Sequence, residues 1–375
     1  MTTTSLRAWA WVHKWTSLTC TAFLLVLCVT GLPLLFSDQI EAWLSPTAAY
    51  AKLPPDAPRA SLDPMVQMAH QLRPHEVVTG IFIDPDEPEV RVHTAASHAV
   101  ANASSANLHW LKFDARTGAL LGDSTRAAVP ANRLDQVFFA LHSRLLLGSA
   151  GLAVMATMGL AFLAAIVSGV VLYAPFMRRL NFGVVRRDRS RRVRRLDTHN
   201  LFGVVTMAWA LVVGATGVMN ELTDPLFDHW QHRVVVTAAA RWGGQPIPAD
   251  ARLASVQAAL EVARRAAPGM VVTGIDYPGA TLDSTRHYMV WARGGTAATA
   301  RLFTPVMVDA LDGRLTAVLP MPWYLRAIEV SRPFHFGDYG GLPLRLIWGL
   351  FDLATIVVLV TGLQLSLFPS KRRRP

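Results

Sequence analysis

Four long apolar blocks alternate with polar segments along the chain. Residues 16–36, 145–177 and 201–220 contain no charged side chain, and residues 346–370 contain one, Asp352. A helix of about 20 apolar residues crosses a hydrocarbon core of about 30 Å, so each block predicts a transmembrane helix. The first block is longer than the apolar run of a signal peptide, about 7–15 residues, and we interpret it as an uncleaved span.

The two long polar segments, 37–141 and 221–343, share one order of local patterns. In each, a helix-like spacing of apolar residues is followed by VVTGI, at 77–81 and at 271–275, and later by a strand that ends in a turn. The pattern predicts a small α+β domain in each segment, made of one short helix and a few antiparallel strands. The glycine of VVTGI indicates a β-bulge or a close approach of backbone.

The similarity between the halves extends into the spans. VVTGI recurs after 194 residues, Thr30-Gly31 recurs as Thr216-Gly217 after 186, and Ser168-Gly169 matches Thr361-Gly362 after 193. We infer a duplicated chain in which two parallel halves are related by an axis along the membrane normal. The predicted organisation is the N-terminus and first helix at 1–36, a domain at 37–141, the second helix at 142–177, an Arg-rich loop at 178–198, the third helix at 199–220, a domain at 221–343, the fourth helix at 344–370 and a tail at 371–375.

The net charge of +10 is concentrated in short segments. Residues 178–195 contain nine Arg and one Asp, and the tail contains four cations. Because short loops rich in Lys and Arg remain on the cytoplasmic side, both termini and this loop are predicted to be cytoplasmic. Topology and contact with membrane lipid account for the cations, and we expect no nucleic-acid partner.

Four histidines fall in the register of the duplication. His13 maps onto His199 at the cytoplasmic ends of two spans, and His142 maps onto His335 at the outer ends. Parallel halves bring equivalent residues to the same depth, so the sequence predicts one histidine pair near each face of the membrane. Imidazole binds iron, zinc and copper, and two facing imidazoles can hold one haem b between helices.

Neighbouring residues support two bis-His haem sites. Ser17 and Gly203 lie four positions after His13 and His199, where a small side chain lets a flat macrocycle approach the helix. Arg144 and Arg332 lie close to the outer pair and could meet haem propionates. A bis-His iron has no open position, which favours electron transfer. The alternative is that all four histidines only anchor helix ends at the membrane interface.

Other polar residues give weaker indications. Asp352, inside the fourth span, could orient a ligating histidine or carry a proton, or it could form an interhelical hydrogen bond to Ser, Thr or Trp. Cys20 and Cys28 are predicted to be apolar packing residues, since neither belongs to a CxxCH haem-attachment motif. The remaining eight histidines are predicted to be solvated: His70, His75, His93, His98, His109, His229, His232 and His287.

Several motifs together resemble one membrane family. HKWTSL, LHSRLLLG, THNLFGVV and FHFGDYGGLP stand close to the starts of the four spans, and TG or SG stands near the span ends. In these features the chain resembles the PepSY-associated transmembrane proteins, iron-regulated membrane proteins that include FoxB-like ferrisiderophore reductases. The resemblance implies PepSY-like extracytoplasmic domains, bound b-type haem and, in the FoxB-like members, reduction of ferric siderophores.

The expectation is therefore an α-helical membrane protein with two haems b per chain that reduces a ferric siderophore or another Fe(III) chelate. No nicotinamide, flavin or phosphate-binding motif is present, so electrons are expected from a quinol or a cytoplasmic reductase. One alternative is a membrane-anchored PepSY module that binds or senses a ligand without redox chemistry. Another is a siderophore uptake permease, although four unbroken spans in parallel repeats are unlike most transporters.

Overall fold

The computed structural model describes residues 2–44, 46–103, 107–126, 131–177, 183–241, 247–248, 251–280, 284–296 and 299–368. The chain divides into two compact units. Unit 1 consists of residues 1–37, 137–223 and 331–375, and unit 2 consists of residues 38–136 and 224–330. The predicted tail at 371–375 and the first residues of the Arg-rich loop, 178–182, lie outside the described residues.

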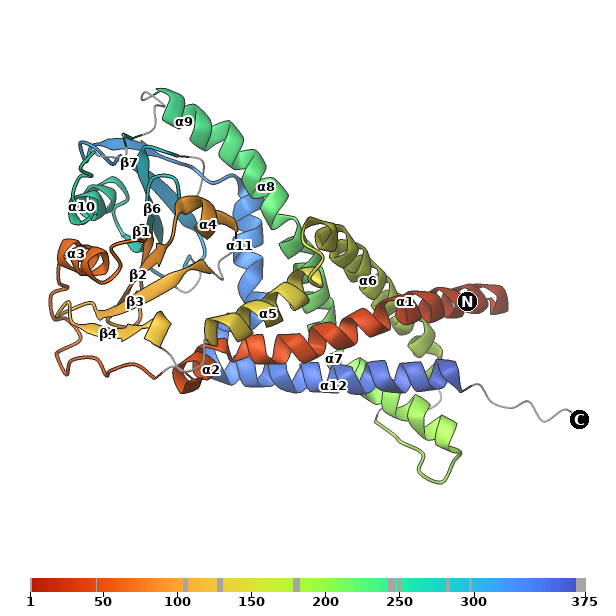
Figure 1. The fold of residues 1–375 in the computed structure, drawn as a ribbon. Helices are drawn as coiled ribbons and strands as arrows, with labels where there is room; N and C mark the ends of the chain where they lie inside the picture. Colours follow the sequence, from red (N-terminus) through yellow and green to blue (C-terminus); the bar gives the residue numbers. More distant parts are fainter. Residues whose placement is uncertain are drawn as a thin grey trace, which may run out of the picture. The chain divides into compact units, whose positions relative to one another are not determined.

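Unit 1 is built from long apolar helices. Within the described residues, four helical segments are long and apolar enough to cross a membrane. They are α1 (Thr3–Leu35), α6 (Ser149–Met177), α7 (Arg191–Glu221) and α12 (Gly341–Leu367), the last preceded by a 3-10 turn, η4 (Asp338–Gly340). Figure 1 shows α1 and α12 running alongside one another.

The four helices form a closed bundle. α1 packs against α6 and α12, and α7 packs against the same two helices, so α1 and α7 lie on opposite sides of the bundle. Large apolar side chains such as Leu160, Val205 and Leu350 remain exposed on its outside. Such a surface suits lipid, because helices satisfy their own backbone hydrogen bonds there. Unit 1 is therefore the membrane part of the protein.

The helices that carry the outer histidines differ from the prediction. His142 lies in the last turn of α5 (Ala131–Arg144), a helix separate from α6, and Leu145 and Leu146 between them adopt positive φ angles of 51° and 60°. His335 likewise lies in the last turn of α11 (Trp323–Phe336), before η4 and α12. The apolar pattern could not locate these breaks, because the break after His142 is itself made of leucines.

Unit 2 contains one antiparallel sheet of eight strands in the order β4-β3-β2-β1-β5-β6-β7-β8. The strands are β1 (Val77–Ile83), β2 (Glu89–Ala95), β3 (His109–Asp114), β4 (Leu120–Asp123), β5 (Met270–Asp276), β6 (His287–Gly294), β7 (Phe303–Asp309) and β8 (Leu315–Val318). Its longer helices are α3 (Leu62–Leu72) and α10 (Val256–Ala266). Shorter helical segments are α2 (Ser37–Leu44), α4 (His98–Ala103), η2 (Ser124–Arg126), α8 (Thr223–Trp230), η3 (Gln231–Val235) and α9 (Val236–Arg241).

The two VVTGI segments meet at the centre of this sheet. β1 and β5 pair antiparallel, with Ile81 opposite Ile275. Since these two isoleucines are equivalent in the repeat, the local two-fold axis of unit 2 passes between them. The register of each VVTGI strand against its own neighbour, β2 or β6, shifts at the Thr-Gly step, as the predicted bulge requires. A Cβ at Gly80 would lie 3.1 Å from the carbonyl oxygen of Ile275 across the junction.

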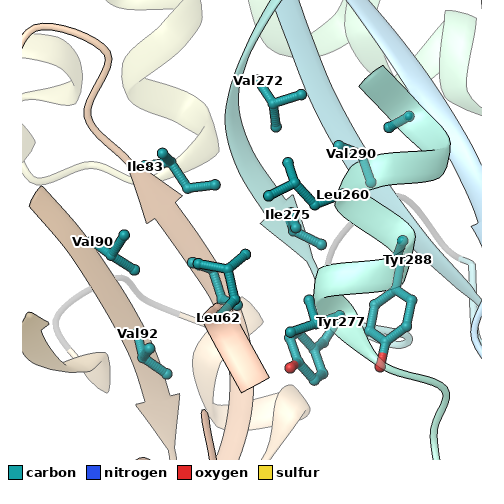
Figure 2. Packing of buried hydrophobic residues seen from close by; sticks show 14 of the residues in the cluster. Leu62, Ile83, Val90, Val92, Leu260, Val272, Ile275, Tyr277, Tyr288 and Val290 are labelled. Carbon is teal, nitrogen blue, oxygen red and sulfur yellow. The ribbon is translucent and has the colours of Figure 1, made fainter. Parts of the chain in front are cut away.

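The halves share one core as well as one sheet. The largest buried cluster takes residues from α3, α10 and the strands of both halves, and Figure 2 shows Leu62, Ile83, Val90 and Val92 of the first half with Leu260 and Ile275 of the second. The two predicted domains are thus two copies of one α+β motif that fuse into a single unit. A four-stranded sheet with one exposed hydrophobic edge gains stability by pairing that edge.

Candidate functional site

The structure brings the predicted histidine pairs together in unit 1. The imidazoles of His13 on α1 and His199 on α7 have ring centroids 6.4 Å apart and ring planes at 73°. Those of His142 and His335 are 6.3 Å apart with planes at 68°. Two pairs with nearly equal geometry follow from the duplication, because equivalent helices supply equivalent side chains.

Each imidazole is held by a neighbouring helix through Nδ1. The ring nitrogen lies 2.9 to 3.0 Å from a backbone carbonyl oxygen: His13 from Ala165, His142 from Leu27, His199 from Val358 and His335 from Val213. A hydroxyl oxygen lies 3.1 to 3.3 Å from the same nitrogens: Ser168, Thr30, Thr361 and Thr216, in that order. Because a carbonyl only accepts, Nδ1 must carry the proton, which leaves Nε2 with its lone pair.

A glycine after each hydroxyl residue makes room for the ring. A Cβ added at Gly31, Gly169, Gly217 or Gly362 would lie 3.1 to 3.2 Å from the Cε1 atom of the histidine held there. The repeated Ser/Thr-Gly dipeptide is therefore a receptor for an imidazole: the turn before it supplies the carbonyl, the hydroxyl adds a second acceptor, and the glycine gives space. Sequence reasoning used these dipeptides only to align the halves and did not assign them this role.

The spacing of the rings fits one metal ion between each pair. Imidazole nitrogen binds a transition metal at about 2 Å and lies about 1 Å from its ring centre, so two axial imidazoles have ring centres about 6 Å apart. A protonated Nδ1 bound to a carbonyl, with Nε2 free for the metal, is also the usual arrangement of a ligating histidine. The two pairs match both criteria.

Each histidine pair offers two protein ligands to such an ion. Within the described residues, no three His, Cys, Asp or Glu side chains come together as a metal-binding cluster. Two protein ligands on opposite sides of the metal suit a flat macrocycle that supplies the equatorial nitrogens, as haem does. Gly203 agrees with this, since a Cβ there would meet no protein atom within 4 Å, which leaves space one turn after His199.

Comparison with known proteins gives the same family as the motifs. The family model for the PepSY-associated TM region matches residues 10–367. The chain belongs to the PepSY-associated transmembrane family. No curated protein sequence matches it significantly.

In this PepSY-associated protein the two histidine layers are well separated along the bundle. On α1, His13 and the carbonyl of Leu27 that receives His142 are fourteen residues apart, and on α7 His199 and Val213 have the same separation. At 1.5 Å per residue this corresponds to about 21 Å along the helix axis. The layers therefore lie near the two ends of the hydrophobic part of the bundle.

Asp352 lies between the layers and does not orient a histidine. The residue is 8% exposed, and its carboxylate lies beside the thiol of Cys28 on α1. The Nδ1 atoms of all four histidines are instead bonded to carbonyl and hydroxyl oxygens. Of the two functional roles predicted for Asp352, the orienting role is wrong. Oδ2 of Asp352 has no hydrogen-bond partner among the described residues, and the interhelical hydrogen bond to Ser, Thr or Trp stays a prediction.

The two arginines predicted to bind propionates lie on the same helices as the outer histidine pair. Arg144 ends α5 two residues after His142, and Arg332 lies on α11 three residues before His335. Both side chains are half-buried and both make polar contacts in the structure. They share the end of unit 1 that holds the outer pair.

Unit 2 offers a second candidate site on its sheet. A cavity of about 350 Å³ lies at the β1–β5 junction and is lined on both sides of it by Thr79, Phe82, His93, Thr273, Asp276 and Trp291, among others. The indole of Trp291 donates a 2.8 Å hydrogen bond to Asp276. A cavity with aromatic walls and a few polar groups suits part of an organic ligand.

One of the histidines expected to be solvated is buried. His287 is 1% exposed, and its Nδ1 lies 3.0 Å from the hydroxyl of Ser284. It begins β6 and pairs with Asp309 on β7. The position of one histidine in a strand could not show whether its side chain would face the core or the solvent.

Proposed function

We propose that this protein is a di-haem b ferric reductase of the membrane, in which each histidine pair binds one haem. The observation that carries the proposal is the geometry of the two pairs: ring centroids 6.3 and 6.4 Å apart, with every Nδ1 bound to a backbone carbonyl. Haem bound there would supply one-electron transfer, because two axial imidazoles leave no open position for a substrate.

The protein's own residues define what each site does. The carbonyl acceptors hold the proton on Nδ1 and fix each ring, so that the lone pair of Nε2 would be available to a metal. Gly203 leaves open space one turn after His199. Arg144 and Arg332 are suited to the carboxylates of the outer group.

The direction of transfer follows from the predicted topology. With the Arg-rich segment cytoplasmic, the His13–His199 pair lies at the inner side, and a quinol or a cytoplasmic reductase donates there. A haem held by the His142–His335 pair would supply one electron to each Fe(III) ion of a siderophore or other chelate on the periplasmic side, which would become Fe(II). Hard oxygen ligands hold Fe(II) less strongly than Fe(III), so reduction releases the metal. The cavity at the β1–β5 junction is the proposed place for part of the chelate.

The test is haem content per chain in the purified protein. We expect two haems in the wild type, one in His199→Ala, one in His142→Ala and none in the double variant, with reduced-minus-oxidised spectra of b type. The control is His232→Ala, an exposed histidine of unit 2, which keeps both haems. Absence of haem from the wild type, or two haems in the double variant, would refute the assignment.

A second measurement separates the reductase from a plain electron carrier. Dithionite-reduced protein is mixed with a ferric hydroxamate chelate, and reoxidation is followed by absorbance. Reoxidation stoichiometric with Fe(II) formation supports reduction of the chelate. A haem-loaded protein that does not reduce any ferric chelate would leave the binding or sensing module, with haem as its sensor, as the function.

A further inference from the structure

Four arginines surround a cavity at the end of unit 1 that carries the inner histidine pair. The cavity has a volume of about 690 Å³ and is lined by Arg187, Arg191, Arg194, Arg195, Thr198 and Thr361. Arg191, Arg194 and Arg195 follow the three- and four-residue spacing of one helix face on α7, and Arg187 comes from the segment that precedes the helix. Like charges this close repel one another unless an anion lies between them.

Both carboxylates of this segment are already engaged by other arginines. Asp197 pairs with Arg186, and Asp188 pairs with Arg189. Within the described part of the chain, the four arginines of the cavity have no ion pair and no side-chain hydrogen bond to a carboxylate. The protein therefore gathers four guanidinium groups and provides no counter-charge for them.

A buried ion pair holds the cavity in shape. Asp197, 6% exposed on α7, accepts hydrogen bonds from the backbone N–H and Nε of Arg186 at 3.0 Å and from its terminal nitrogen at 2.8 Å. This ties the segment before α7 back onto the helix and keeps Arg187 next to the arginine face. A solvated run of cations on a loop would not need such a buried attachment.

The cavity also reaches the interior of the bundle. Thr361, on its wall, is the residue whose hydroxyl lies 3.3 Å from Nδ1 of His199. The end of α12 is held next to α7 here, because Arg192 of α7 donates hydrogen bonds to the carbonyls of Leu365 and Phe368 at 2.9 and 2.8 Å. The arginines thus line an open depression beside α7 that extends to Thr361 of α12.

We propose that this cavity is a binding site for a phosphate anion. Guanidinium groups bind phosphate oxygens in pairs, and four of them match an anion with more than one negative charge. The two sources of such a group are the headgroup of an anionic lipid, as expected for a basic pocket between helices on the cytoplasmic side, and a soluble phosphate compound. Neither the proposed haem sites nor the topology requires the four arginines to share one cavity.

The experiment compares ligand retention by native mass spectrometry of the full-length protein in detergent. The variant is Arg194→Gln/Arg195→Gln. Its charge-matched control is Arg314→Gln/Arg326→Gln, because both arginines are exposed and neither lines the cavity. The probes are cardiolipin, phosphatidylcholine as the lipid without net charge, and inorganic pyrophosphate as the soluble phosphate.

We expect wild type and control to retain cardiolipin over phosphatidylcholine, and the cavity variant to bind it about 30-fold more weakly, from the loss of two interfacial cations. Selective binding of pyrophosphate, lost in the same variant, would also support the site and would identify a soluble source. Equal binding of both phosphate probes by variant and control would overturn the proposal. Loss of haem from the variant without a change in phosphate binding would assign the arginines to haem carboxylates and overturn it as well.

Discussion

The Gly362→Ala substitution gives a sharp test of the histidine receptors. Gly362 follows Thr361 on α12, and a Cβ there would lie 3.1 Å from Cε1 and 3.4 Å from Nδ1 of His199. Carbon atoms in contact prefer a separation of about 3.5–4.0 Å, so the methyl group must displace the ring by about 0.4–0.9 Å or move α12 away from α7. Displacement of the ring lengthens the 2.9 Å hydrogen bond from Nδ1 of His199 to the carbonyl of Val358.

The cost can be estimated from this overlap. Excess volume in a well-packed site costs about 1–3 kcal/mol, which corresponds to about 5- to 150-fold weaker binding of the group that needs the undisturbed ring. Functional sites of this kind tolerate displacements of about 0.5 Å. Alanine is also favoured over glycine within a helix by about 1 kcal/mol, so the variant is expected to fold and to reach the membrane.

The assay is haem content together with a redox titration of the purified protein. We expect Gly362→Ala to lose most of one haem, or to shift the midpoint potential of one of two components, while the other component is unchanged. The matched control is Gly349→Ala on the same helix, where a Cβ would meet Phe36 and Leu32 at 3.6 to 3.7 Å, an ordinary contact. If Gly362→Ala retains two haems with unchanged potentials, the receptor geometry does not hold a ligating histidine and the reasoning fails.

Three further predictions concern the buried groups of both units. Asp352→Asn is expected to retain both haems, because the Nδ1 atoms of all four histidines have carbonyl partners and none contacts Asp352; loss of either haem in its spectrum would contradict this. Ile275→Asn should lower the stability of unit 2 by about 3–4 kcal/mol, since Ile275 is fully buried at the β1–β5 junction, whereas Phe82→Asn, at an exposed position of the same junction, should cost much less; equal unfolding midpoints would refute the shared core. Burial lowers the pKa of His93 to about 4 and also lowers the pKa of His287. The folded state therefore favours the neutral imidazoles. Their contribution to stability is complete above the unfolded pKa of about 6.5 and is lost as the pH falls toward 4. Thermal unfolding should show a free energy of unfolding that is about 1–3 kcal/mol lower at pH 4.5 than at pH 7.5, with a smaller decrease in His93→Gln. An equal decrease in that variant would exclude His93 as a cause.

The sequence was sufficient for everything that depends on local composition and on the repeat. Apolar length predicted the four long helices, and the offset between the halves paired His13 with His199 and His142 with His335, whose rings lie 6.4 and 6.3 Å apart in the structure. A duplicated sequence places equivalent residues in equivalent surroundings. That inference needs no knowledge of which surfaces touch.

The tertiary structure decided how the two copies meet. The repeat could not show that β1 and β5 pair around Ile81 and Ile275, because the same strands could equally belong to two separate sheets. Burial of the exposed hydrophobic edge of each copy favours the single sheet. The helix break after His142 was also invisible, since it lies within a run of leucines.

The role of the Ser/Thr-Gly dipeptides likewise depends on contacts between distant helices. In the sequence these dipeptides only helped to align the two halves of the chain. In the fold, each provides a carbonyl, a hydroxyl and free space to an imidazole from another helix. Asp197 and Arg186 are close in sequence, but only the fold shows that their pairing assembles the four-arginine cavity. Periodicity and the repeat therefore determined which residues lie at the same depth in the membrane. The contacts of each residue were determined by side-chain packing across the bundle, because a linear pattern does not encode which helices touch.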